Sequence, residues 1–269
     1  GTIPPELNGA FYRVQPDPQF PPRSDDDISF NGDGMITRFH IHDGQCDFRQ
    51  RWAKTDKWKL ENEAGKALFG SYRNPLTDDE SVKGKIRGTA NTNAWIHGGK
   101  LYALKEDSPA LVMDPATMET EGFTHFFNDK TGQKMTGQTF TAHPKIDPDT
   151  GEMVFFAYMA TGPFSADVMV HKVNRDGILT ESIHIPTPYS SMVHDFVITE
   201  NYIIIPVMPI TGSLDRAMVG GPPFAWEPEK GVHLGILPRH GGTAANIRWV
   251  EMDLCFVFHF MNGFDRDGV

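Results

Sequence analysis

The chain has 269 residues, of which 39% are hydrophobic, enough to bury a large core in one big domain or two ordinary ones. Its net charge is −10, with 35 acidic against 25 basic residues, so we expect no nucleic-acid partner. Two cysteines make no disulfide framework, and the chain has neither a membrane-length apolar run nor a signal-peptide pattern, so we expect a cytoplasmic protein without membrane contact.

Glycine and proline are frequent along the whole chain, with 26 and 20 residues, and long apolar patterns of helical period are scarce. Many short strands between turns is the organisation that this pattern predicts, so an all-β fold is favoured. Near the start, residues 28–35 form a loop around Gly32 and Gly34 that we expect to expose Phe30 and Met35. The loop has too few oxygen ligands for an EF-hand calcium site.

Two hairpins are predicted in the first half of the chain. Residues 36–41 and 45–55 are joined by an Asp-Gly turn, and residues 94–97 and 100–106 by a Gly-Gly turn. Further turn signals recur downstream without long helices between them. The pattern favours an up-and-down β architecture, although no sequence period identifies a propeller.

Two stretches of the first half are open to both a purely structural and a functional interpretation. Residues 58–88 are polar and predicted to be irregular, and Tyr72 within them is typical of a loop anchor. Lys105 and Glu106 follow four core-like residues of the second hairpin. From the residues alone, this pair is more typical of a strand that emerges into water than of a site.

Residues 190–207 are predicted to be two strands that reverse at Glu200-Asn201, the first of which carries His194. A histidine held by neighbouring strands suits a metal ligand, which must be fixed before the metal arrives. An isolated strand histidine is more often a partly buried side chain satisfied by the backbone.

Two further histidines lie in similar stretches. Pro144 fixes the backbone directly after His143, and the alternation in residues 253–260 places His259 at the end of an apolar row on a predicted strand. These histidines and His194 could meet only if their strands run toward one axis, which spacing cannot establish.

Several short motifs follow one another along the whole chain in a recognisable order. They are Phe30-Asn31-Gly32-Asp33-Gly34-Met35, Arg51-Trp52 with Thr55, Ala90-Asn91-Thr92-Asn93, Glu106, Thr141-Ala142-His143-Pro144, His194-Asp195-Phe196 with Thr199, Leu237-Pro238-Arg239, and Phe258-His259 with Asn262. In these motifs the chain resembles the carotenoid cleavage oxygenases, a family of non-haem iron dioxygenases.

The resemblance implies a seven-bladed β-propeller with a ferrous iron, Fe(II), on its axis, held by four histidines. His143, His194 and His259 match three of these ligands, and the fourth would lie beyond the last residue of this chain. Glu106 matches a carboxylate that accepts the distal N–H of an iron-bound histidine. We therefore expect residues 1–269 to be a single β-propeller domain that is incomplete at the C-terminus and also at the N-terminus.

Within the family, three residues point to the substrate. Lys105 and Tyr72 match a lysine–tyrosine pair of the lignostilbene (stilbene-cleaving) dioxygenases, and Phe30 matches an aromatic residue that packs on the substrate ring. The implied reaction is cleavage of the central C=C bond of a 4-hydroxystilbene with O2 to two aromatic aldehydes, in which Lys105 and Tyr72 act on the phenol.

Two alternatives stay open at this stage. An apocarotenoid-cleaving oxygenase of the same family would leave Lys105 merely solvated. A non-catalytic propeller that binds a partner is compatible with the absence of the fourth histidine and need contain no iron. The expected partners are a small aromatic alkene and O2, and the sequence leaves a homodimer open.

Overall fold

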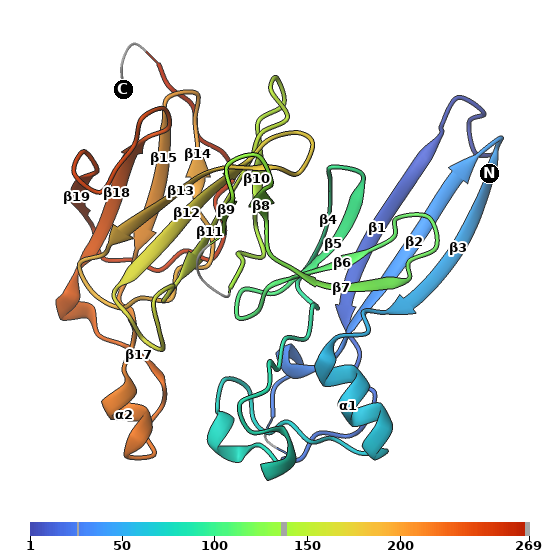
Figure 1. Cartoon of the computed structure of the whole chain (residues 1–269), viewed down its shortest axis with the longest axis horizontal. Helices are drawn as coiled ribbons and strands as arrows, with labels where there is room; N and C mark the ends of the chain where they lie inside the picture. The colour runs from blue at the N-terminus through green and yellow to red at the C-terminus, as the bar shows by residue number, and fades with distance from the viewer. Residues whose placement is uncertain (26, 136–138, 267–269) are drawn as a thin grey trace. The chain divides into compact units, whose positions relative to one another are not determined.

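The computed structural model describes residues 1–25, 27–135 and 139–266, which form two compact units, residues 1–124 and 125–269. Each unit is built from small antiparallel sheets whose strands mostly follow one another along the chain (Figure 1). The predicted all-β class is confirmed by this organisation.

Unit 1, residues 1–124, contains two sheets with the strand orders β1–β2–β3 and β4–β5–β6–β7. The sheets share a buried cluster to which Ile36 of β2 and Leu101 of β5 belong, and both side chains are fully buried. Burying such an aliphatic side chain contributes roughly 1.5–3 kcal/mol. The strands are β1 (Gly9–Pro16), β2 (Gly34–His42), β3 (Gln45–Trp52), β4 (Asn93–His97), β5 (Lys100–Leu104), β6 (Ala110–Met113) and β7 (Thr120–Thr124).

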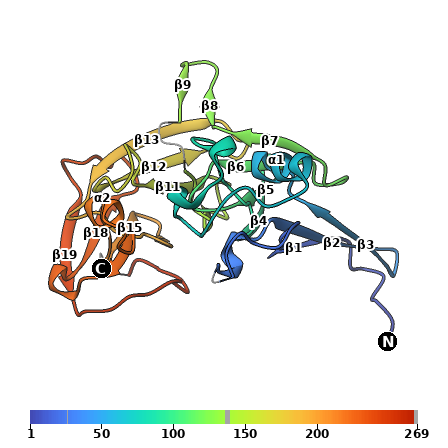
Figure 2. The same cartoon turned by 90° about the horizontal axis from the view of Figure 1, so that it is seen from below.

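Unit 2, residues 125–269, contains two four-stranded sheets, β10–β11–β12–β13 and β14–β15–β18–β19. Their apolar faces share one core, in which Phe156 of β11 and Ile203 of β15 are both buried. The strands β8 and β9 form a separate ribbon that projects from the sheet at β13 in Figure 2. The strands are β8 (Phe127–Asn128), β9 (Gln133–Lys134), β10 (Lys145–Ile146), β11 (Met153–Tyr158), β12 (Asp167–Val173), β13 (Leu179–Pro186), β14 (Val197–Ile198), β15 (Tyr202–Val207), β16 (Ile210–Gly212), β17 (Phe224–Trp226), β18 (Val232–Pro238) and β19 (Arg248–Met252).

Four-stranded antiparallel sheets connected in an up-and-down order are the blades of a propeller. The sheet β4–β7 and the sheet β10–β13 both follow this order without a crossover. Seven blades and a single domain that spans residues 1–269 stay predictions.

Both predicted hairpins of the first half are confirmed, as β2–β3 and β4–β5. The prediction that residues 58–88 are irregular is wrong at its start, where α1 forms. The hydroxyl of Thr55 caps this helix by accepting a hydrogen bond from the Trp58 N–H at 3.1 Å, and Gly65 ends it with a φ of 66°.

The helices of the described ranges are α1 (Asp56–Ala64), α2 (Leu214–Met218) and the 3-10 turns η1 (Ser29–Asn31), η2 (Pro75–Thr77), η3 (Glu80–Val82) and η4 (Pro228–Lys230). None of these helices has the length and apolar character needed to cross a membrane.

One predicted strand is absent from the described ranges and another is shortened. The predicted strand that carries His194 is reduced to β14, and His194 lies in an irregular segment before it, whereas the reversal at residues 200–201 and the second strand, β15, are confirmed. Residues 253–260 form no strand, and His259 is exposed instead of ending an apolar row. Backbone donors of this segment bind elsewhere, since the Val257 N–H donates to the Met208 sulfur at 3.1 Å.

The loop of residues 28–35 contains η1 and leads into β2. Phe30 is 59% exposed, as expected, whereas Met35 is buried because it lies within β2. The Asp33 carboxylate is also buried, and it forms an ion pair with Lys57 at 3.0 Å. A carboxylate already neutralised by an ammonium group agrees with the exclusion of a calcium loop.

Candidate functional site

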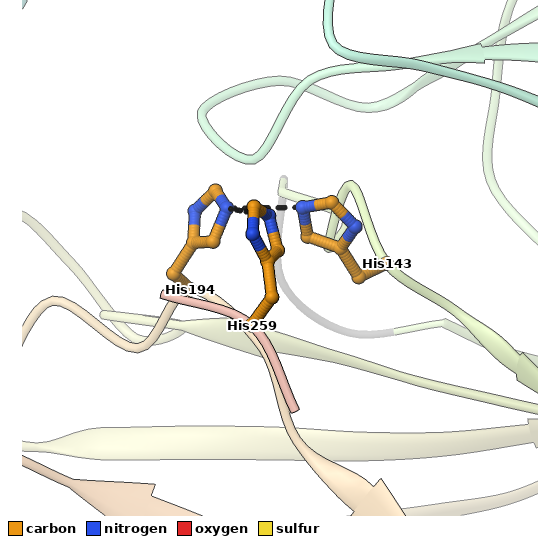
Figure 3. Close-up of side chains that lie close together, drawn as sticks. All are labelled: His143, His194 and His259. Carbon is orange, nitrogen blue, oxygen red and sulfur yellow. Dashed lines mark hydrogen bonds between the residues drawn. The ribbon is translucent and has the colours of Figure 1, made fainter. Parts of the chain in front are cut away.

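Three imidazoles meet in unit 2, although their residues are far apart in the sequence. The Nε2 atom of His194 lies 3.0 Å from that of His143 and 3.2 Å from that of His259. Figure 3 shows the three rings pointing toward one another, with dashed lines along these two contacts. One nitrogen from each ring lies within 4.8 Å of the others, so the three could hold one metal ion.

The chemistry of this donor set fits a transition metal. Imidazole nitrogens at about 2.0–2.1 Å from one ion lie roughly 3.3 Å apart, close to the observed separations. Burial and the neighbouring His194 lower the pKa of His143 to about 4, so this ring is neutral at physiological pH. Neutral imidazoles are the form that binds metal, and they suit iron among several transition metals.

One carboxylate joins the three segments that carry these histidines. Asp195, directly after His194, is buried and accepts a hydrogen bond from Lys145 Nζ at 2.6 Å. Its other oxygen accepts from the Phe260 N–H at 2.9 Å. Burial alone would raise the pKa of Asp195, but these donors and the Phe196 N–H lower it below its usual range. Because Lys145 follows His143 by two residues and Phe260 follows His259 directly, Asp195 holds all three histidine segments together.

Replacing Asp195 by asparagine should therefore loosen the histidine cluster. The amide cannot pair with the Lys145 ammonium as a charge, so we expect the free energy of unfolding to fall by about 1–3 kcal/mol. Metal retention after dialysis should fall as well, because the histidines are less well ordered. Chemical denaturation and metal analysis check both effects, with Asp176→Asn, an exposed turn carboxylate, as the matched control. A variant with wild-type stability and metal content would contradict the role of Asp195.

A second cluster, in unit 1, contains the three residues predicted to bind substrate. Lys105, directly after β5, is 4% exposed, and its Nζ donates to the Phe30 carbonyl at 3.1 Å. The same nitrogen lies 5.0 Å from the centre of the Tyr72 ring and 5.7 Å from that of Phe30. The two rings contact each other edge to face at 6.1 Å. Lys105 is thus a buried cation beside two aromatic side chains, not the end of a strand emerging into water.

Burial shifts the proton equilibria of this cluster. Desolvation lowers the pKa of Lys105, although Asp107 and Glu106 oppose the shift. Desolvation also raises the pKa of Tyr72 well above its usual range. Tyr72 therefore stays a neutral phenol that can donate a hydrogen bond, and Lys105 is closer to releasing its proton than a surface lysine.

Glu106 is also buried, contrary to its interpretation as a surface charge, and it forms an ion pair with Arg73. Arg73 has a φ of 55°, in the left-handed region that residues other than glycine rarely adopt. Its guanidinium also lies 3.8 Å from Asp107. A strained backbone position next to Tyr72 is a feature typical of functional sites.

The loop that carries Phe30 is fixed by a close approach of two segments. The Asn91 amide donates to the carbonyls of Phe30 and Gly32, at 2.8 and 2.7 Å. A side chain at Gly34 would bring its Cβ within 2.1 Å of the Ala90 carbonyl oxygen, so only glycine fits there. Two motifs that are far apart in the sequence therefore position the Phe30 carbonyl for Lys105.

The structure thus groups the seven predicted residues into two sets. His143, His194 and His259 converge in unit 2, and Phe30, Tyr72 and Lys105 lie together in unit 1, with Glu106 beside them. Three contributors were missed at the sequence level: Asp195, Arg73 and Asn91. Asp195 and Asn91 lie inside motifs that were recognised, and for Asp195 the available signal was a carboxylate directly after a predicted ligand.

An all-β chain of propeller-type sheets with three convergent imidazoles defines the class, a β protein with a histidine cluster that could hold a metal ion. The family model described as retinal pigment epithelial membrane protein matches residues 1–269. The chain therefore belongs to this family, that of the carotenoid cleavage oxygenases, and the resemblance in its motifs is confirmed.

Two relatives and one solved structure illustrate the similarity. The chain is 51% identical to lignostilbene-alpha,beta-dioxygenase isozyme III of Sphingomonas paucimobilis, over 99% of this chain and 54% of the relative. It is 47% identical to resveratrol cleavage oxygenase 1 of Chaetomium globosum, over 96% and 43%. The crystal structure of Pseudomonas brassicacearum lignostilbene dioxygenase superposes with a TM-score of 0.86 at 41% identity, over 93% of this chain and 51% of that one. The chain spans about half the length of the curated relatives it matches.

Proposed function

We propose that this protein is a non-haem Fe(II) dioxygenase that cleaves the central C=C bond of a 4-hydroxystilbene with O2 and releases two aromatic aldehydes. The observation that carries the proposal is the buried Lys105 ammonium beside Tyr72 and Phe30. It is supported by relatives named for lignostilbene and resveratrol, compounds in which a phenol is conjugated to a C=C bond.

His143, His194 and His259 are the proposed iron ligands, with a fourth histidine that the family pattern places after the last residue of this chain. When bound, ferrous iron would supply the redox chemistry that makes O2 reactive toward an alkene. Glu106, held by Arg73, is the carboxylate proposed to accept the distal N–H of one ligand and so to orient its ring.

Lys105 and Tyr72 are proposed to bind the 4-hydroxyl of the substrate while Phe30 packs on its ring. The phenolic proton would pass from the substrate oxygen to Lys105 Nζ in its neutral amine form, which the lowered pKa of Lys105 makes easier to reach than in a surface lysine. The oxygen that loses its proton pushes electron density through the ring to the central double bond. Tyr72 stays protonated and would donate a hydrogen bond to that oxygen.

The alternative within the family, cleavage of an apocarotenoid, requires no phenol-binding lysine. Its simplest form leaves Lys105 solvated, and the 4% exposure of this residue argues against that form. Desolvating an ammonium group is unfavourable, so a buried lysine without a role at the substrate would only lower the free energy of unfolding.

A direct comparison of substrates tests the proposed reaction. Full-length protein loaded with iron should convert a 4-hydroxystilbene to two aldehydes, with consumption of O2, and should convert an apocarotenal at least about fivefold more slowly, since one missing polar contact costs about 1–3 kcal/mol. Aldehydes are measured by chromatography and rates are normalised to bound iron. Faster cleavage of the apocarotenal would favour the alternative, and the absence of both iron and turnover would favour a binding module.

We also propose the cytoplasm as the location and a small aromatic alkene with O2 as the partners. The acidic net charge of −10 disfavours nucleic acid, and a homodimer stays open.

A further inference from the structure

A second cluster of metal-binding side chains lies in unit 1, on the hairpin of β2 and β3. The side chains are His40 and His42 of β2 and Asp47 of β3, and one ligand atom of each lies within 4.8 Å of the others. It shares no residue with the histidine cluster of unit 2 or with the Lys105 cluster.

The hairpin brings these residues to one face by its register. His40 and His42 are two apart on β2, so their side chains share a face, and Asp47 is the partner of His40 across the strands. Asp43 and Gly44 form the turn with φ values of 49° and 70°, as in a tight two-residue hairpin.

The distances suit a shared ion. The Oδ2 atom of Asp47 lies 2.9 Å from His42 Nε2 and 3.9 Å from His40 Nδ1. Ligands bonded at about 2.0–2.2 Å in a tetrahedral shell lie roughly 3.3 Å apart, between these two values. The two rings are 4.7 Å apart between centres.

The other nitrogen of His42 also has a partner. Its Nδ1 lies 3.3 Å from Asp43 Oδ2, so this carboxylate can accept the remaining N–H and fix the ring with Nε2 toward Asp47. Next to His40 and Asp47 on the same face lie Arg38 and Arg49. Their guanidinium groups both donate hydrogen bonds to the Ala116 carbonyl, at 3.2 and 3.0 Å.

We propose that His40, His42 and Asp47 form a surface site for a divalent transition-metal ion of the zinc type. Two imidazoles and one carboxylate are a ligand set that zinc takes in proteins, with a fourth position left to water. Asp43 orients His42 and does not bind the ion. Cys46 lies on the opposite face, because it is the partner of Ile41, and is not a ligand.

The experiment is a titration of the full chain with Zn²⁺ alone, measured by calorimetry. Elemental analysis after gel filtration then gives the amount of bound zinc. Wild-type protein should bind one equivalent more than His42→Ala. Asp47→Asn should weaken this equivalent by at least about 100-fold, and Asp43→Asn by about 10- to 100-fold, as is common for partners of a ligand. Cys46→Ser is the matched control and should bind as the wild type does.

Asp47 is 68% exposed and Asp43 is 90% exposed, so neither amide should disturb folding, and circular dichroism checks this. His194→Ala should leave the hairpin equivalent in place, which separates this site from the proposed iron site. Equal Zn²⁺ stoichiometry in wild type and His42→Ala would overturn the proposal, and so would a lost equivalent in Cys46→Ser.

Discussion

Replacing His194 by alanine in the full-length protein should abolish both iron retention and turnover of a 4-hydroxystilbene. The Nε2 atom of His194 lies between those of His143 and His259, at 3.0 and 3.2 Å, so its loss removes the middle ligand of the cluster. The remaining ligands, His143, His259 and the proposed fourth histidine, form an incomplete set that binds an ion far more weakly, by more than the 10- to 100-fold typical of an indirect partner.

The measurement is iron per protein after gel filtration, together with aldehyde formation. His240→Ala, which removes an exposed histidine of the same unit, should retain iron and activity. An active His194→Ala protein with a full complement of iron would show that the three histidines are not the ligands.

Replacing Lys105 by methionine should remove most turnover of a 4-hydroxystilbene without loss of iron. A thioether of similar length can fill the space beside Phe30 and Tyr72 but cannot take the phenolic proton. Tyr72→Phe deletes one hydrogen bond and keeps the ring packing. Its loss should be the smaller one, about 1–3 kcal/mol or roughly 5- to 150-fold in rate.

The substrate itself offers the sharpest control. A 4-methoxystilbene has no proton to give up, so the wild-type enzyme should cleave it poorly, and Lys105→Met should not slow it further. Lys100→Met, at the other end of β5, removes an exposed lysine paired with Glu121 and should leave kcat/KM unchanged. Equal rates on the phenol and its ether, or a fully active Lys105→Met variant, would refute phenol activation.

The hairpins β2–β3 and β4–β5 could be predicted because their signals are local. An Asp-Gly or Gly-Gly turn between alternating residues is enough to define the register of the two strands. The helix α1 was missed for a different reason. Its capping residues, Thr55 and Gly65, were visible, but its polar composition hid the helical pattern.

The prediction that His194 and His259 lie on strands was wrong, because strand-forming residues need a partner strand to form a ladder. The Phe260 N–H binds the Asp195 carboxylate and the Val257 N–H binds the Met208 sulfur, and these contacts replace a ladder. β propensity measures how well a residue fits a paired surface, so it fails where no such surface exists.

By itself, the sequence determined the all-β class, the family and the identity of the residues proposed for the site, because turn chemistry, residue type and motif order are all properties of the linear chain. Only the tertiary structure decided that His194 meets histidines 51 and 65 residues away, and that Asp195 joins their segments. It also decided that Lys105 is buried beside two aromatic rings instead of lying in water. These contacts depend on how sheets pack across long stretches of chain, and that packing is set by the burial of many apolar side chains together, which no local pattern specifies.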